Sequence, residues 1–323
     1  MRKKEAVMNK LIPVIYACDN SLVNYLMVSI NSLVANSSEN NKYRIHILNT
    51  DISKENKKKL SELNRDNVSI KFTDLRDVIA SLKLSKEAKE RLEKPNYFKL
   101  FAPEILVKYE KAVYLEAATV VNSDIAELFK IELEGKALAA APEQIAIKKN
   151  VYGTYVEKRL GINRDRFFNT GVLVLDMNVL REAELIKALE KKLKKHAFEV
   201  LQDEEFLNIC FKNSVKFLST EWNVEAINAD LDAKKAKLVQ YVMFTNPLHY
   251  KDCPLGDFFW RYAKGLSVFD ILKAELDGYT AMDKAADKNM RFAVLETAIR
   301  EIEREMQYML ENVAVKAENP KIA

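Results

Sequence analysis

Short apolar runs rich in β-branched residues alternate with amphipathic segments along the first part of the chain. The runs LIPVIYA (11–17), YRIHILN (43–49) and VSIKFTDL (68–75) predict buried strands. Between them, apolar residues recur at helical spacing in 22–34 and 53–63. Parallel strands need a crossover connection, and a helix usually provides it. The sequence therefore predicts an α/β fold in which helices flank a parallel sheet.

The same pattern continues further along the chain. Ligands of such sheets sit beyond the carboxyl ends of the strands, so residues 17–21 and 116–119 are candidate site positions. The basic stretch 145–166 is expected to be irregular. The other predicted elements are strands at 111–115, 137–144 and 167–177 and helices at 96–106, about 179–195 and 203–211.

Charge and composition exclude several classes of protein. The 51 basic and 47 acidic residues leave a net charge of only +4. Basic and acidic residues are too nearly balanced for a nucleic-acid binder, which needs an excess of positive charge. With only 7 glycines, neither a GxGxxG nor a Walker A phosphate loop is present. Cys18, Cys210 and Cys253 are widely spaced, which favours a reducing compartment. We expect a cytoplasmic protein without signal peptide or membrane span, with peripheral contact at the inner membrane face left open.

The tail of the chain carries a different pattern. We expect one domain over residues 1–270 and a helical extension over 271–323. Within the extension, residues 290–313 allow either packing on the same domain or self-association with another chain. The apolar positions that form this heptad seam are Phe292, Leu295, Ile299, Ile302, Met306, Met309 and Val313.

Five segments follow one another in order over about residues 11–263: IPVIYACDNSLVNYLMVSINSL, YFKLFAPEILVKYEKAVYLEAATVVNSDIAELF, FFNTGVLVLDMNVLRE, DEEFLNICF and LHYKDCPLGDFFWRYA. Together they resemble glycosyltransferase family 8, which includes bacterial lipopolysaccharide galactosyl- and glucosyltransferases and glycogenin. The resemblance implies a GT-A fold, with a mixed, mostly parallel sheet flanked by helices. It also implies retaining transfer of a hexose from a UDP-sugar to a saccharide, with Mn²⁺ or Mg²⁺.

The family's metal-binding YLDSD corresponds here to YLEAA. Glu116 takes the first acidic position, and Ala118 lacks the second carboxylate. The late histidine ligand corresponds to His249. Because a divalent ion neutralises charge that develops on the leaving diphosphate, losing one anionic ligand should weaken its binding. By contrast, Asp124 is expected to cap the helix that follows it.

The resemblance also implies residues that bind the donor nucleotide. Ala17, Cys18 and Asp19 match the uridine-binding segment, and Asp19 either accepts a hydrogen bond from uracil or caps a helix. Lys99 replaces an arginine of the family. Lys251 either meets a phosphate or is a solvated surface residue, because the family's diphosphate loop after the histidine is absent here.

The residues implied for the sugar are Asn169 and Thr170, which match the family's FNSG. Glu205 stands at the sugar-contacting aspartate, because DEEFLN replaces the family's DQDxLN. Glu143 is a similarly shifted acid after strand 137–144, and Glu116 is a third. Catalytic candidates are therefore Glu205, Asn169 and Glu143, and Thr170 is grouped with the donor-binding residues.

Two functions remain open at this point. The first is a transferase that acts on lipopolysaccharide or another surface glycan with an altered metal site. The second is a catalytically inactive homologue that serves as a nucleotide-binding or scaffolding partner. Both share the same expected partners: a nucleotide sugar, a saccharide acceptor, and a homo- or hetero-oligomer through residues 290–313.

Overall fold

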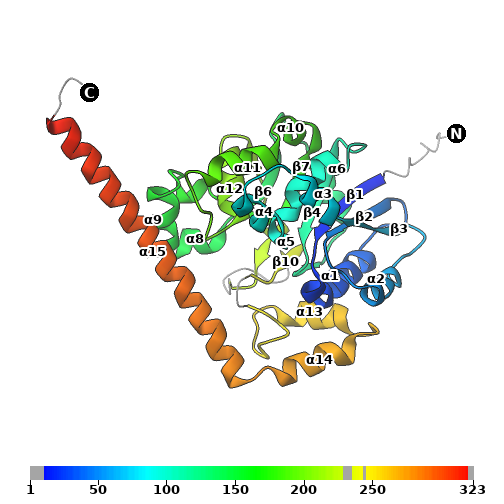
Figure 1. Cartoon of the computed structure of the whole chain (residues 1–323). Coiled ribbons are helices and arrows are strands. Elements are labelled where there is room, and N and C mark those ends of the chain that lie inside the picture. Colours follow the sequence, from blue (N-terminus) through cyan, green and yellow to red (C-terminus); the bar gives the residue numbers. More distant parts are fainter. Residues whose placement is uncertain (1–10, 228–234, 243–244, 319–323) are drawn as a thin grey trace.

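The computed structural model describes residues 11–227, 235–242 and 245–318 and has a mixed seven-stranded sheet at its centre (Figure 1). The strands are β1 (Leu11–Ala17), β2 (Lys42–Asn49), β3 (Val68–Asp74), β4 (Lys111–Glu116), β6 (Leu138–Pro142), β7 (Phe168–Asp176) and β8 (Val215–Phe217). Their order is β3-β2-β1-β4-β7-β6-β8, and only β7 runs antiparallel to its neighbours. The predicted mixed, mostly parallel sheet is confirmed.

Helices cover both faces of this sheet, which explains why its strands are apolar without alternation. Successive residues of β1 point to opposite faces, so Val14 and Tyr16 enter one core while Ile15 and Ala17 enter the other. The longer helices are α1 (Val23–Ala35), α2 (Lys54–Ser61), α9 (Asn150–Lys158), α11 (Leu185–Leu193), α12 (Asp203–Phe211), α13 (Gly256–Ala263), α14 (Phe269–Gly278) and α15 (Ala281–Glu318). The shorter ones are α3 (Arg76–Ser81), α4 (Lys86–Leu92), α5 (Pro95–Phe98), α6 (Ala102–Ile105), α7 (Ile125–Phe129), α8 (Gln144–Lys148) and α10 (Met177–Glu182).

The structure corrects three predicted elements. The predicted helix at about 179–195 is two helices, α10 and α11, because the chain turns at Glu184, whose φ is +45°. The predicted helix at 96–106 is divided into α5, the 3₁₀ turn η2 (Lys99–Phe101) and α6. The stretch 145–166 is not irregular, because α8 ends and α9 lies within it. In α9, Tyr152, Tyr155 and Val156 pack into a core at helical spacing, a signal that the surrounding basic residues obscure.

A second, smaller sheet lies beside the end of β4. It consists of β5 (Thr119–Val121), β10 (Leu238–Gln240) and β9 (Val224–Glu225), in that order. β10 pairs antiparallel with β5 and parallel with β9. This sheet brings Gln240 and Glu225, which are distant in sequence from β4, toward the centre of the molecule.

The helix α15 crosses α8 and α9 and then projects beyond the body of the molecule (Figure 1). Ala298 is fully buried, and Val294, Leu295 and Ile302 pack beside it. Arg159 of α9 forms ion pairs with Glu301 (3.0 Å) and Glu305 (3.2 Å). This part of the extension thus packs on its own chain, while self-association stays a prediction. The side chain of Val313 lies outside the described residues.

After the part of α15 that contacts α9, several apolar residues of this helix face solvent. Met306, Tyr308, Met309 and Leu310 are all more than half exposed. None of the helices in the described residues combines the length and hydrophobicity that crossing a bilayer requires.

Candidate functional site

The carboxyl end of β4 and the start of β7 meet at one edge of the large sheet. Because β7 runs antiparallel to β4, its first residues lie beside the last residues of β4, and Leu115 pairs with Val172. This register places Glu116 next to Gly171. The first turn of α12, with three consecutive acidic residues, approaches the same edge. Polar residues from three segments thus converge where α/β sheets bind ligands.

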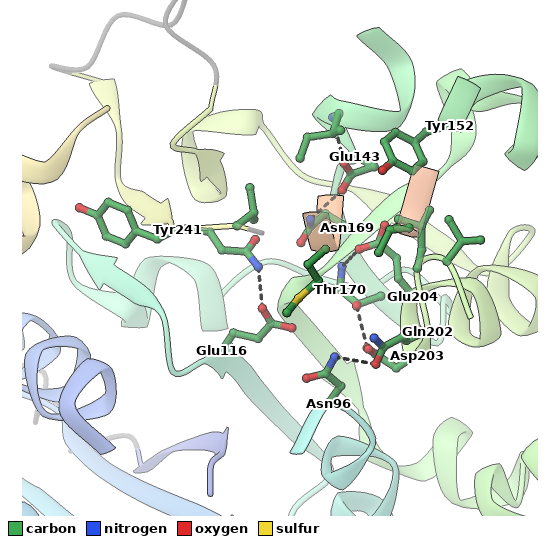
Figure 2. Close-up of a pocket in the computed structure, with 17 residues that line it drawn as sticks. Asn96, Glu116, Glu143, Tyr152, Asn169, Thr170, Gln202, Asp203, Glu204 and Tyr241 are labelled. Atoms are coloured by element: carbon green, nitrogen blue, oxygen red, sulfur yellow. Dashed lines mark hydrogen bonds between the residues drawn. The ribbon is translucent and has the colours of Figure 1, made fainter. Parts of the chain in front are cut away.

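A cavity of about 350 Å³ opens between these segments, and we call it the acidic cavity (Figure 2). Its wall contains four carboxylates but no lysine or arginine among the described residues. The lining residues are Asn96, Glu116, Glu143, Ile145, Tyr152, Asn169, Thr170, Val200, Leu201, Gln202, Asp203, Glu204, Gln240, Tyr241, Val242, Met290 and Val294.

A second cavity of about 320 Å³ adjoins the first, and we call it the strand-end cavity because Ala17 closes β1 there. It shares Asn96, Glu116 and Tyr241 with the acidic cavity. Glu116 is its one acidic lining residue among those described. The remaining lining residues are Leu22, Tyr25, Pro95, Tyr114, Ala117, Ala118 and Asn246.

The ammonium of Lys99 lies beneath both cavities, buried in the protein. It donates to Asp203 Oδ2 (2.7 Å) and to the carbonyl oxygen of Thr170 (3.0 Å), and it lies 3.4 Å from Glu116 Oε1. Its Nζ also lies 4.5 Å from the centre of the Tyr114 ring. Burial alone would lower the pKa of Lys99, but Asp203, Tyr114 and Glu116 outweigh it, so the pKa of Lys99 is raised. Lys99 therefore stays charged and positions the carboxylates above it.

Glu116 is held from its other side by Gln240, whose Nε2 donates to Glu116 Oε2 at 2.7 Å (Figure 2). Gln240 reaches this position across Gly171. A Cβ at residue 171 would lie 2.1 Å from Gln240 Nε2, which is far inside van der Waals contact. Glycine at this position thus makes room for the amide that orients Glu116.

Three glutamates surround Asn169. The Nδ2 of Asn169 donates to Glu143 Oε2 (2.7 Å) and to Glu225 Oε1 (3.2 Å), while Glu204 Oε2 accepts from the amide of Thr170 (3.3 Å). Burial, followed by the charge of Glu143, raises the pKa of both Glu204 and Glu225 well above the usual range. Burial thus favours the protonated forms of Glu204 and Glu225, and a protonated carboxyl group can donate as well as accept a hydrogen bond.

Glu205 does not line either cavity. Its carboxylate is fully buried, where Oε2 accepts from Tyr155 Oη (2.9 Å) and contacts His196 Nε2. Its Oε1 accepts from the amides of Val200 (3.0 Å) and Leu201 (2.5 Å). The structure thus places Glu205 outside both cavities and Glu204 at the wall of the acidic cavity. The direction of each side chain in this first helical turn depends on how the turn is oriented, which the sequence does not specify.

Two residues expected near the nucleotide serve the local fold. Asp19 Oδ1 accepts from the amides of Ser21 (3.0 Å) and Leu22 (3.1 Å), so Asp19 caps the 3₁₀ turn η1 (Asn20–Leu22). Cys18 is fully buried, and its Sγ donates to the carbonyl of Asp19. Neither residue lines a cavity, whereas Ala17 does.

Lys251 and Asp124 have local roles as well. Lys251 pairs with Asp277 at 2.7 Å on the surface, with both side chains mostly exposed, which agrees with the solvated alternative. Asp124 caps α7 by accepting from the amide of Ala126 at 2.9 Å, and this prediction is confirmed.

The residues proposed to hold a divalent cation do not form a complete ligand set. Glu116 offers one carboxylate, and the methyl group of Ala118 offers no donor. His249 stacks on Tyr279 with ring centres 3.7 Å apart, and its Nδ1 lies 3.9 Å from Asp287 Oδ2. Within the described ranges, no three His, Cys, Asp or Glu side chains gather in a way that could hold a metal ion. These residues do not fit a hard cation that prefers several oxygen ligands.

Several site residues were not predicted from the sequence. Most of the polar contacts in the site that we did not expect involve four residues: Glu204, Gln240, Glu225 and Asn96. Gln240 directly follows the apolar residues of β10, and this position at a strand end is the one signal that could have identified it. Met290 and Val294 of the extension also border the acidic cavity, so the helix beyond the expected boundary at 270 contributes to the site.

Residues 13–253 match the family described as Glycosyl transferase family 8. A Haemophilus influenzae protein assigned as a glycosyltransferase is 27% identical over 224 residues, covering 69% of this chain and 66% of that protein. The lipopolysaccharide 1,2-glucosyltransferase of Escherichia coli is 26% identical over 167 residues, covering 47% of this chain and 48% of that protein. The matches thus span less than two thirds of the length of either relative.

Among solved structures, the bifunctional glycosyltransferase WbbM in its apo form superposes with a TM-score of 0.71 at 23% identity, covering 84% of this chain and 52% of that one. The galactosyltransferase LgtC, solved with donor and acceptor sugar analogues, has a TM-score of 0.62 at 20% identity, with coverages of 82% and 96%. These likenesses concern the fold, and they confirm the expected GT-A-like architecture.

Proposed function

The chain belongs to glycosyltransferase family 8, and from this premise we propose that it transfers a hexose from a UDP-sugar to a saccharide acceptor with retention of anomeric configuration. The acceptor class that we propose is lipopolysaccharide or another surface glycan, and the place of action is the cytoplasm. The likeness to the lipopolysaccharide glucosyltransferase of Escherichia coli supports the acceptor class. Retention is the outcome that the family resemblance implies.

The observation that carries this proposal is the pair of adjoining cavities. The strand-end cavity suits a nucleoside, because the ring of Tyr25 and the amide of Asn246 offer a base both an aromatic surface and a hydrogen-bonding group. The acidic cavity suits a sugar, because carboxylates and amides form directional hydrogen bonds with hydroxyl groups. Asn96, Glu116 and Tyr241 border both cavities, so the bond between nucleotide and sugar would lie next to them.

Several residues of this chain have definable tasks in the transfer. Glu116, oriented by Gln240 and Lys99, presents a fixed oxygen pair at the junction of the two cavities. Asp203 is held by Lys99 and by Thr170 Oγ1 (3.0 Å) at the wall of the sugar cavity. Glu204, whose pKa is raised by burial, can give or take a proton near the reacting hydroxyl. Since the described residues do not fit a metal, no step is assigned to one.

Transfer from a panel of UDP-hexoses tests the proposal. The full-length protein is incubated with UDP-glucose, UDP-galactose or UDP-galacturonic acid and a mixture of oligosaccharides, and products are followed by proton NMR. We expect release of UDP and an α-linked product from an α-linked donor. The variant Asn96→Ala, at the cavity junction, should lower kcat/KM by about tenfold.

The matched control is Asn40→Ala, which removes an exposed asparagine outside both cavities and should leave the rate unchanged. If UDP does not bind and no UDP-hexose is consumed, the proposed function is overturned. A product of inverted configuration would overturn retention alone.

A further inference from the structure

A third cavity of about 510 Å³ opens where α15 crosses the segment around residue 149, and we call it the basic cavity. Four cationic side chains line it, and no described carboxylate does. Lys284, Lys288 and Arg291 follow at spacings of four and three on α15, which places them on one face of the helix. Lys149, from the start of α9, completes the set.

These lysines are available to a ligand. Lys149, Lys284 and Lys288 are exposed, and none of them forms an ion pair with a described carboxylate. The carboxylate of Asp287, on the next turn of the same helix, accepts instead from Tyr250 Oη at 2.8 Å. The positive charge of the cavity is therefore not neutralised by its own walls.

Aromatic rings accompany the cations. Lys284 Nζ lies 5.6 Å from the centre of the Tyr250 ring, and Lys288 Nζ lies 5.8 Å from that of Phe292. Phe292 is 52% exposed, although it sits in the wall of a cavity. Rings with exposed faces beside positive charges are suited to a saccharide that carries an anionic group, because sugars stack on such faces.

The basic cavity adjoins the acidic cavity. Ile145 and Tyr152 line both cavities. The helix α15 also lines both, with Met290 and Val294 at the acidic cavity and Phe292 at the basic cavity. The strand-end cavity shares no lining residue with the basic cavity. The three cavities thus form a row, with the acidic cavity in the middle.

We infer that the basic cavity binds the acceptor and that this acceptor is an anionic saccharide, with a phosphate or carboxylate group near the hydroxyl that is glycosylated. The inference rests on the proposed function, which places the nucleotide at the other end of the row. An anion is repelled by the carboxylates of the acidic cavity and attracted by Lys284 and Lys288. The charges therefore orient the acceptor, with its neutral hydroxyl in the acidic cavity and its charged group in the basic one.

Binding of small anionic sugars to the full chain tests the inference. Glucose 6-phosphate and glucuronic acid are the probes, glucose is the neutral counterpart, and titrations are followed by NMR. We expect at least one of the two anions to bind about tenfold more tightly than glucose, with an affinity that falls as salt is added. The two probes distinguish phosphate from carboxylate as the recognised group.

The variant Lys284→Gln/Lys288→Gln should bring the affinity for the anionic probe down to that for glucose while leaving UDP affinity unchanged. Its matched control is Lys54→Gln/Lys58→Gln, an exposed pair at the same spacing on α2, far from α15 (Figure 1), which should change neither affinity. If glucose binds as tightly as both anions, or if the Lys284/Lys288 variant binds like wild type, the inference is overturned. Failure of wild type to bind UDP would instead overturn the proposed function.

Discussion

The ammonium of Lys99 lies 2.7 Å from Asp203 Oδ2, and this buried pair joins the helix that starts at Asp203 to the turn that starts at Lys99. Glu116 is the second carboxylate within reach of the same ammonium, at 3.4 Å. One buried cation thus balances two acids that the proposed reaction needs in fixed positions. Because a buried charge without a partner is costly, each member of the group depends on the others.

Replacing Lys99 by methionine should destabilise the protein by about 3–5 kcal/mol, because it leaves Asp203 buried without its counter-charge. Urea denaturation measures the loss. Adding Asp203→Asn to this variant should restore part of the stability. The control is Lys251→Met, which breaks the exposed pair with Asp277 and should have no measurable effect. Equal stability of Lys99→Met and wild type would show that the pair does not hold the site.

Replacing Gly171 by alanine should displace the amide of Gln240 and so free Glu116. We expect the free energy of unfolding to fall by about 1–3 kcal/mol, because a hydrogen bond to a charged group is lost. We also expect the KM for the donor to rise. Gln240→Ala should have a similar effect, and the double variant should be little worse than either single one. Strictly additive effects would contradict the mechanism. Gly278→Ala is the control, since nothing lies within 4 Å of a Cβ there.

Glu204→Gln and Glu205→Gln should have opposite effects, and each serves as the control for the other. Glu205→Gln should cost about 1–3 kcal/mol of stability, because an amide cannot accept all the hydrogen bonds that the carboxylate accepts. Its kcat should stay near that of wild type. Glu204→Gln should keep the stability and lower kcat. Loss of kcat in a fully folded Glu205→Gln variant would return Glu205 to the list of catalytic candidates.

Stability should fall as pH rises, partly because of Glu225. Burial raises the pKa of Glu225 well above the usual range of a glutamate, so between its pKa in the unfolded chain and its pKa in the folded protein the folded protein binds more protons. In that range the free energy of unfolding decreases with increasing pH. Glu225→Gln removes this titration, so its Tm should exceed that of wild type by more at pH 8 than at pH 5. Exposed Glu39→Gln is the control, and a pH-independent difference would contradict the assignment.

Ala118→Asp should give the site a second carboxylate two residues after Glu116. We expect Mn²⁺ to tighten UDP binding to this variant by about tenfold more than to wild type, in line with the effect of ligand-sphere changes. Calorimetry with and without Mn²⁺ measures the difference, and Ala118→Asn is the uncharged control. If wild type already gains tenfold from Mn²⁺, residues beyond the described ones complete the ligand set.

The large sheet could be predicted because its strands are buried on both faces and appear as continuous apolar runs, as in 11–17 and 167–177. Asp124 could be predicted because an N-cap depends only on neighbouring residues. The sequence could not show whether Glu204 or Glu205 faces the acidic cavity. Adjacent residues of a helix point about 100° apart, and only tertiary packing decides which of the two faces the cavity. Gln240 could not be placed, because its position depends on the pairing of β10 with a strand far away in the sequence.

Residues 13–253 match the family, yet α15 begins at Ala281 and still forms a wall of both the acidic and the basic cavity. One wall of each cavity is therefore supplied by a part of the chain outside the family match, while Ile145 and Tyr152, which line both cavities, lie inside it. If the basic cavity binds the acceptor, changes in α15 alone can alter acceptor preference while the family signature stays the same. Exchanging the region after residue 270 between such proteins should transfer acceptor choice while leaving the donor unchanged.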